Sequence, residues 1–145
     1  MIGDLGTSGP LPTLQTVMNF ASRRHRLLLH NIANISTPGY RTKDVSVPAF
    51  QKQLAAAVED RRERTGSAAG ELHVKSTREV SVDAAGRLVL RPRAMSSNIL
   101  FHDGATRDLE VEMQSLVENQ TVYRMAGDFM KARFDLLRMA ISERV

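Results

Sequence analysis

The sequence predicts a mainly α-helical chain, in which N- and C-terminal heptad helices form a coiled-coil-like pair with a small irregular or β insert between them. Three observations support this fold class. Near both ends of the 145-residue chain, apolar residues recur in alternating steps of four and three. Aromatic residues make up only 5% of the chain, which favours packed helices over a β-sandwich. The middle instead carries Gly-rich and short β-type stretches.

The first region, residues 1–36, is expected to be a flexible leader followed by an inner helix that opens at Pro12 or Thr13. The helix is expected to end at Thr37-Pro38-Gly39, because proline disfavours the α conformation of the residue before it. Its heptad seam consists of Leu14, Met18, Ala21, His25, Leu28, Ile32 and Ile35.

The end of this helix opens a second region, residues 37–54, predicted as a turn and an extended or short helical segment. Pro38 and Gly39 occupy the central positions of a type II β-turn, Thr37–Tyr40. Asn31 and Asn34 share one helix face, where their amides can bond the unpaired carbonyls of the helix end or the returning chain. Tyr40 offers a ring that can pack back onto the helix. From these residues alone, the segment is a capped helix end.

The third region, residues 55–102, is predicted as a variable insert with short strands. The residue pattern changes several times along it, and Gly and Asp residues separate short apolar runs. The elements expected around and within it are a helix over Gln51–Arg64, a linker-like gap over Gly66–Gly70, β-type runs at Leu72–Val74 and Arg87–Leu90, a turn at Asp83–Gly86 and irregular chain over Arg91–Asp103.

The fourth region, residues 103–145, is predicted as one long C-terminal inner helix, capped by Asp103, Thr106 or Asp108. Its heptad seam would span roughly 50 Å at 1.5 Å per residue, which predicts an elongated molecule. The seam consists of Leu109, Met113, Leu116, Gln120, Tyr123, Gly127, Met130, Phe134, Leu137 and Ile141.

Both helices carry more apolar surface than one seam uses. The simplest partner for each seam is the other terminal helix, and the polar or small seam residues His25, Gln120 and Gly127 are typical of seams that specify register and partner. We therefore expect the seam residues to serve in helix packing and assembly, and a second face to meet other subunits that complete the fold. The residues off the seam are Val17, Leu27, Leu29, Val117, Val122, Met125 and Phe129.

The net charge of +4 and the basic isoelectric point require nucleic acid to be considered as a partner. The charges are spread along the chain, however, and no aromatic residues interleave with the basic clusters Arg23–Arg26 and Arg61–Arg64. We interpret both clusters as solvated surface and predict no nucleic-acid partner. A basic helical nucleic-acid-binding protein stays as the alternative from another class.

No catalytic, cofactor-binding or metal-ligating residue is predicted. The four histidines lie outside any H-E-x-x-H pair, and the chain has no Walker A sequence and no G-x-S-x-G elbow. The carboxylates Glu59, Asp60, Glu110 and Glu112 are interpreted as solvated helix charges. No cysteine is present, and no apolar run approaches the ~20 residues that cross a bilayer, so we predict neither disulfides nor direct membrane insertion.

Motifs at both ends of the chain resemble one family. The motif Asn31-Ile32-Ala33-Asn34-x-x-Thr37-Pro38-Gly39-Tyr40-Arg41 resembles the N-terminal signature of bacterial flagellar rod and hook proteins. The chain is identified as a member of the flagellar basal-body rod protein family, most similar to its proximal rod subunit. Further resemblances lie in Lys43–Val45, Phe50–Leu54, Asp108–Met113, Glu118–Tyr123 and Phe134–Ile141. Asp103–Leu109 departs from the D-G-N-N-V-D-L sequence that the family tends to have there. Met125–Gly127 differs from the FlgC type, which makes that sister protein less similar.

The resemblance implies a non-enzymatic structural subunit of the proximal rod, which assembles through its terminal helices into a helical axial structure that transmits torque. Implied partners are further copies, rod proteins of the FlgC, FlgF and FlgG types, a FliE-type adaptor, and the export apparatus with the MS ring. The implied location is the rod in the periplasmic space, after export without a cleaved signal peptide. Another axial protein, FlgC-like, is the alternative within the class. The motif residues Asn31, Ala33, Asn34, Thr37, Pro38, Gly39 and Tyr40 are then expected to fix where the inner helix ends.

Overall fold

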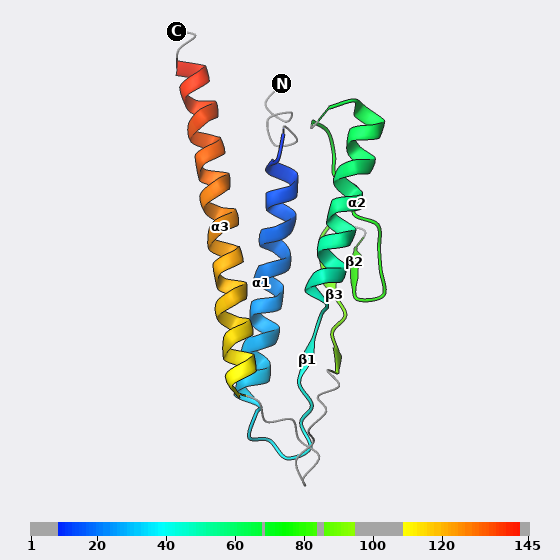
Figure 1. Ribbon diagram of the computed structural model, residues 1–145, viewed down its shortest axis with the longest axis vertical. Coiled ribbons are helices and arrows are strands. Elements are labelled where there is room, and N and C mark those ends of the chain that lie inside the picture. Colours follow the sequence, from blue (N-terminus) through cyan, green and yellow to red (C-terminus); the bar gives the residue numbers. More distant parts are fainter. Residues whose placement is uncertain (1–8, 68, 84–85, 95–108, 143–145) are drawn as a thin grey trace.

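Three helices lie side by side in the computed structural model, which describes residues 9–67, 69–83, 86–94 and 109–142 (Figure 1). They are α1 (Leu11–Ala33), α2 (Val47–Thr65) and α3 (Leu109–Ser142). Four short strands lie between α1 and α3 in sequence: β1 (Lys43–Asp44), β2 (Val80–Val82), β3 (Leu88–Leu90) and β4 (Arg93–Ala94). The predicted fold class, mainly α with terminal helices around a small β insert, is confirmed.

Helix α1 starts earlier than predicted. It begins at Leu11 with Pro10 in the cap position, so the expected start at Pro12 or Thr13 was slightly late. Proline is tolerated in the first turn because its missing N–H has no helical partner there. No side chain caps this end, and the Thr16 hydroxyl donates back to the Pro12 carbonyl (2.8 Å).

The strands form two antiparallel pairs. Val80 lies opposite Leu90 in the β2–β3 hairpin, and Lys43 lies opposite Ala94 in the β1–β4 pair. The run predicted at Arg87–Leu90 is confirmed as β3. The predicted strand at Leu72–Val74 was wrong: the hairpin uses β2 instead, because Val80 is buried in the core whereas residues 72–74 only line a shallow surface beside α1.

Two further predictions for the insert need correction or extension. Arg93–Ala94 forms β4 within a stretch expected to be irregular, because β1 offers it a pairing edge. Arg91 and Pro92 are irregular as expected, and residues 95–103 of that stretch lie outside the described residues. Helix α2 (Val47–Thr65) is longer than the helix predicted over residues 51–64. It also continues across residue 54, where the second predicted region was expected to end. The Ser46 hydroxyl accepts from the Ala49 N–H at its start, and Gly66, with φ +64°, ends it.

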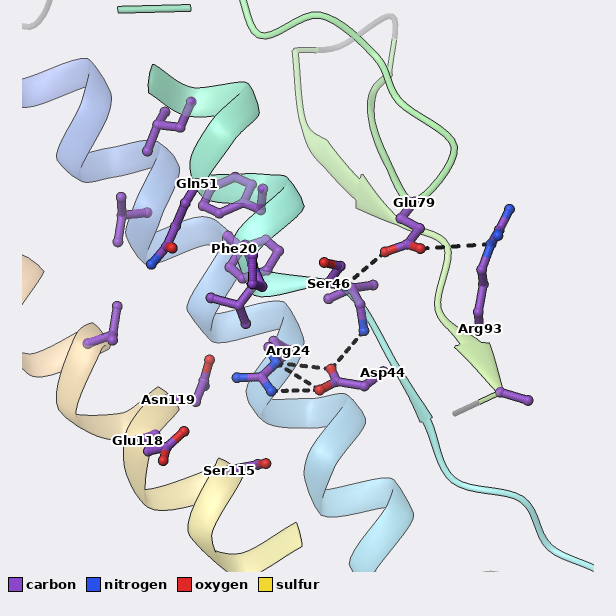
Figure 2. A pocket seen from close by; sticks show the side chains of 18 residues that line it. Phe20, Arg24, Asp44, Ser46, Gln51, Glu79, Arg93, Ser115, Glu118 and Asn119 are labelled. Carbon is purple, nitrogen blue, oxygen red and sulfur yellow. Dashed lines mark hydrogen bonds and ion pairs between the residues drawn. The ribbon is translucent and has the colours of Figure 1, made fainter. Parts of the chain in front are cut away.

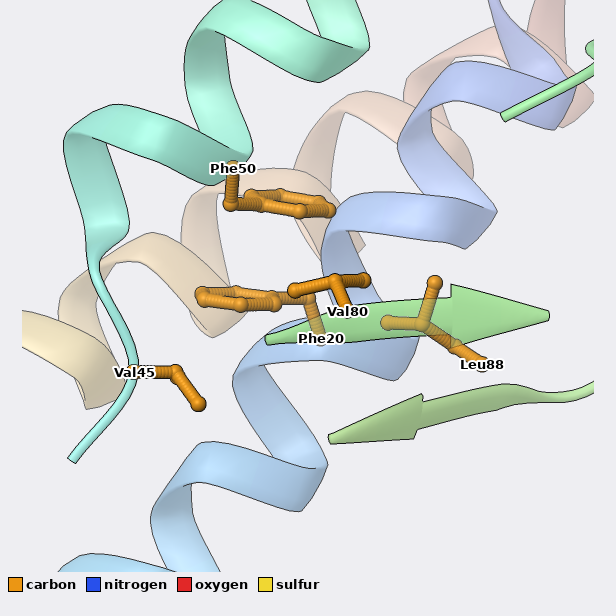
Figure 3. Packing of buried hydrophobic residues seen from close by; sticks show 5 residues of the cluster. All are labelled: Phe20, Val45, Phe50, Val80 and Leu88. Carbon is orange, nitrogen blue, oxygen red and sulfur yellow. The ribbon is translucent and has the colours of Figure 1, made fainter. Parts of the chain in front are cut away.

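A small apolar core joins α1 to the insert (Figure 3). The rings of Phe20 and Phe50 stack with centroids 3.8 Å apart and planes 4° from parallel. Val80 and Leu88 join the cluster from β2 and β3, and Val45 joins it from the connection between β1 and α2. Since only Phe20 comes from α1 and the other members come from the following segments, this cluster fixes the insert against α1.

Helix α3 runs antiparallel to α1 and extends beyond its first turn (Figure 1). Its 34 residues correspond to roughly 50 Å, as the heptad pattern predicted. The expected caps Asp103, Thr106 and Asp108 lie outside the described residues. None of the helices described is both long and apolar enough to span a membrane.

Candidate assembly surface

Asn31 is the centre of the corner where α1 ends, and it is fully buried. Its Nδ2 donates to the Lys43 carbonyl (2.8 Å) and to Glu112 Oε2 (3.1 Å). Its Oδ1 accepts from the Lys43 N–H (3.1 Å) and from the Tyr40 hydroxyl (3.0 Å). One amide therefore links α1 to the returning chain, as the sequence suggested. It also links α1 to α3, a contact that the sequence did not suggest.

The other motif residues complete the helix end. The Asn34 Nδ2 donates to the His30 carbonyl (2.8 Å), one of the carbonyls that the helix leaves unpaired. The Tyr40 N–H donates to the Thr37 carbonyl (3.1 Å), and Gly39 has φ +72°, as the predicted type II turn requires. Ala33, Thr37, Pro38 and Gly39 are themselves exposed.

The Tyr40 side chain packs back onto α1. Its ring lies 5.9 Å from that of His30, and its hydroxyl lies 3.0 Å from His30 Nδ1. Burial raises the pKa of the Tyr40 hydroxyl above its usual value, and the negative charge of Glu112 adds to the shift. The tyrosine therefore stays neutral in the corner and acts there as a hydrogen-bond donor.

A buried ion pair holds β1 against α1 (Figure 2). The Arg24 guanidinium contacts both Asp44 oxygens, at 2.6 Å from Nη2 and at 3.0 and 3.2 Å from Nε, and both side chains are 9% exposed. Arg61 is also buried, with one Nη donating to the Gly9 carbonyl (3.2 Å). The interpretation of both basic clusters as wholly solvated was therefore wrong, because one arginine of each is packed inside.

The face of α3 that meets α1 is centred on Glu112, Asn119 and Ala126, which are buried and seven residues apart. Each precedes a predicted seam residue by one position, but the seam also includes Leu116, Tyr123 and Met130, so the contact face is turned by only about 60° from the centre of the predicted seam. The Asn119 amide donates to the Ala21 carbonyl (2.8 Å). Glu112 was interpreted as a solvated charge, which was wrong: it is 6% exposed and bonded to Asn31.

The predicted seam residues therefore fall into three groups. Ala21 and Leu28 are buried between α1 and its neighbours. Half-buried positions are Leu14, Met18, His25, Ile32, Ile35, Leu116, Gln120, Gly127, Met130 and Leu137. Exposed positions are Leu109, Met113, Tyr123, Phe134 and Ile141. Their common role in assembly stays a prediction.

A second heptad seam follows the other side of α3. It consists of Val111, Ser115, Glu118, Val122, Met125, Phe129, Ala132, Leu136 and Met139, in unbroken steps of four and three. Met125, Phe129, Leu136 and Met139 are each more than half exposed. Only Val122, Met125 and Phe129 of this seam were noted from the sequence as lying off the first one. The regular spacing was present in the sequence and would have revealed the seam.

Part of this second seam forms one wall of a groove of about 840 Å³ (Figure 2). Ser115, Glu118 and Val122 line it from α3, opposite side chains of β1 and α2. Side chains of α1 lie between these two walls, and we call this site the three-walled groove. Within the described residues, no group of His, Asp and Glu side chains is placed to hold a metal ion.

The chain matches no protein-family model, but it is similar to individual flagellar proteins. The flagellar basal body rod protein FlgB of Salmonella typhimurium is 30% identical over 131 residues, which cover 86% of this chain and 89% of the relative. The chain belongs to the FlgB family of flagellar basal body rod proteins. FlgB of Proteus mirabilis (strain HI4320) is 26% identical, covering 82% and 83% of the two chains, and FlgB of Bacillus subtilis is 24% identical, covering 93% and 95%.

Membership of the FlgB family favours neither the FlgC-like nor the nucleic-acid alternative, because all seven matching relatives carry the FlgB name. The match to the Bacillus subtilis protein covers 93% of this chain and therefore reaches both terminal helices and the insert. The corner around Asn31 and the apolar faces of α3 are therefore features of a FlgB-family chain.

Proposed function

We propose that this chain is a structural subunit at the proximal end of the flagellar basal-body rod, where its terminal helices pack into a helical axial structure that transmits torque. Similarity to FlgB rod proteins over most of the chain supports the rod assignment. The corner around Asn31 marks where the inner helix ends and the chain turns outward. This role needs shape and contact surface rather than catalysis, and we assign the chain no reaction.

The observation that carries this proposal is the exposed apolar surface of α3. Among the described residues, fourteen large hydrophobic side chains are exposed, and twelve of them belong to α3. A helix with apolar residues on both flanks is normally buried among other helices. One flank of α3 bears Met113 and Phe134, and the other bears Val122 and Phe129. The helix therefore presents surface for neighbours on two sides.

The proposal extends to partners and location. The chain associates with other rod proteins, and we infer that these are further copies and proteins of the FlgC, FlgF and FlgG types, with a FliE-type adaptor and the export apparatus with the MS ring at the base. We infer that the subunit leaves the cytoplasm without a cleaved signal peptide and resides in the periplasmic part of the rod. The motif residues from Asn31 to Tyr40 would then set the end of the inner helix layer.

The experiment is complementation of the source bacterium after deletion of the gene. We expect the tagged wild-type chain to restore swimming and to copurify with basal bodies, and its absence from purified basal bodies would overturn the proposal.

A Pro38→Ala/Gly39→Ala variant should swim poorly because the helix break is weakened. The matched control is Gly66→Ala, which puts alanine at another helix end, away from the corner, where φ is similarly positive (+64°). As at Gly39, no atom lies within 4 Å of the added Cβ. Normal swimming of the first variant would show that the break is dispensable.

A further inference from the structure

We propose that the C-terminal end of α3 of one copy docks in the three-walled groove of a second copy. This inference rests on the proposed function, because it names the partner of the assembly surface. It concerns two sites that lie at different heights along the same molecule: the end of α3, which projects past α1, and the groove, which lies beside the middle of α1 (Figures 1 and 2).

The last two turns of α3, Asp135–Ser142, are here called the α3 tip. Arg133 is level with the start of α1, because its guanidinium lies 3.2 Å from the position of a Cβ on Gly9. The tip therefore extends beyond α1 (Figure 1). Its side chains Leu136, Met139 and Ile141 are 53%, 53% and 60% exposed.

The tip is apolar around most of its circumference. At 100° per residue, its Leu, Met, Ala and Ile side chains cover an arc of about 200°, twice the stripe that an ordinary core-facing helix buries. Asp135, Arg138 and Ser142 are spaced by three and four residues and form the remaining polar stripe. A flat helix face cannot cover such an arc, so the tip requires a concave partner.

The three-walled groove has the shape and chemistry for this occupant. Its walls carry Val17 and Phe20 of α1, Val47 and Leu54 of α2, and Val122 of α3. It is lined by three carboxylates and two arginines: Arg24 pairs with Asp44, Arg93 pairs with Glu79, and Glu118 has no cationic partner among the described residues. Arg138 on the tip likewise has no anionic partner among them, so the two charges complement each other across the contact.

The contact would be head-to-tail. The tip around Met139 and the groove around Asn119 are about 20 residues apart along α3, an axial offset of about 30 Å. Two different patches meet in such a contact, so it does not close on itself as a two-fold dimer does. Repetition along an axis gives an open helical array, the form that a rod requires.

The test uses disulfide formation in the full-length chain, which has no cysteine of its own. Val122→Cys in the groove is combined with Met139→Cys on the tip. The matched control combines Met139→Cys with Met113→Cys, because Met113 is as exposed as Val122 (46% and 45%) but lies on the other flank of α3. Both pairs are expressed in cells that lack the native copy, oxidised, and analysed on non-reducing gels with an antibody against the chain.

We expect the Val122→Cys/Met139→Cys pair to give a reducible ladder of dimers and longer multimers, and the Met113→Cys pair to give at least tenfold less. A product that stops at the dimer would indicate a closed contact and overturn the head-to-tail arrangement. Equal ladders from both pairs, or cross-links only to a different rod protein, would overturn the choice of groove and occupant. A variant that enters basal bodies and supports swimming without any cross-link would overturn the docking while leaving the proposed function intact.

A second measurement tests the charge complementarity. In the Val122→Cys/Met139→Cys background, Arg138→Glu should lower the yield of multimers several-fold because it faces Glu118. Glu118→Arg added to that variant should restore the yield. Both side chains are exposed in the single chain, so neither change is expected to disturb its folding. An unchanged yield in the single variant would remove Glu118 and Arg138 from the contact and overturn the proposed orientation.

Discussion

At the scale of single residues, Asn31 shows how one amide can join distant segments. Its four hydrogen bonds reach the turn, β1 and, 81 residues later, Glu112 on α3. The Asn31 amide is fully buried and Glu112 is 6% exposed, so these groups in particular need their bonds. The corner is therefore a point where the geometry of α1, the turn and α3 is fixed together.

We expect Asn31→Ala to lower the free energy of unfolding by about 3 kcal/mol, because it leaves the Lys43 backbone groups and Glu112 without this partner. The control is Asn34→Ala, because the Asn34 amide bonds only the exposed His30 carbonyl on the backbone. This change should lower the free energy of unfolding by about 1 kcal/mol. Urea unfolding of the purified chain measures both. Equal losses would contradict the central role of Asn31.

The Arg24–Asp44 pair gives a second prediction. Asp44→Asn leaves a guanidinium buried without its counter-charge, so the free energy of unfolding should fall by about 3 kcal/mol. In contrast, Asp60→Asn breaks an ion pair with Arg64 in which the Arg64 and Asp60 side chains are 42% and 36% exposed. This change should alter the free energy of unfolding by less than about 0.5 kcal/mol. Urea unfolding again decides, and a small effect at Asp44 would show that water reaches Arg24.

The sequence predicted the local chemistry of the corner but not its long-range partners. Asn34, Gly39 and Tyr40 act within ten residues of one another, and known turn and capping geometry is enough to place them. Glu112 and Arg24 are charged residues in amphipathic helices, where exposure is the usual outcome. Their burial depends on which helix face meets which neighbour, and periodicity does not determine that.

At the scale of elements, helix lengths and the inner face of α1 were predictable, because Ala21 and Leu28 of its predicted seam are buried, whereas the inner face of α3 was predicted only in part. The heptad pattern of α3 fixes its extent because it persists without a slip from Leu109 to Ile141. Two seams of equal regularity run along it, and the buried stripe of Glu112, Asn119 and Ala126 lies between them. The misplaced strand at Leu72–Val74 has a similar cause, since the pairing of β2 with β3 is set by burial of Val80.

Gly127 gives a prediction at this scale. It lies in the middle of α3, and a Cβ added there would meet only the Met18 methyl at 3.9 Å, an ordinary contact. Gly127→Ala should therefore raise the free energy of unfolding by about 1 kcal/mol through helix propensity. Gly9→Ala should lower it, because Gly9 has φ +61° and Arg133 lies 3.2 Å from the added atom. Thermal unfolding distinguishes the two, and a loss at Gly127 would mean that the helices pack more closely than described.

At the scale of the whole molecule, stability is unevenly distributed. The stacked rings of Phe20 and Phe50, the buried ion pair and the Asn31 corner all lie along the part of α1 from Phe20 to Asn31. The α3 tip has exposed apolar side chains and extends past the ends of α1 and α2 (Figure 1). The free chain is therefore expected to be ordered near the insert and to depend on its assembly partners at the far end of α3.

Hydrogen exchange measures this gradient directly. In the purified monomer, we expect amides of α1 between Phe20 and Asn31 to exchange slowest, and amides of Asp135–Ser142 to exchange at least a hundredfold faster. The tip amides make the same helical bonds as the rest of α3, but every tip residue except Leu137 is exposed within the described part of the chain, so little tertiary packing opposes their opening. In isolated basal bodies the tip amides should become as slow as those near Asn119, because a neighbour covers them. Uniform protection along α3 in the monomer would contradict this gradient, since it would mean that the helix is complete without its assembly.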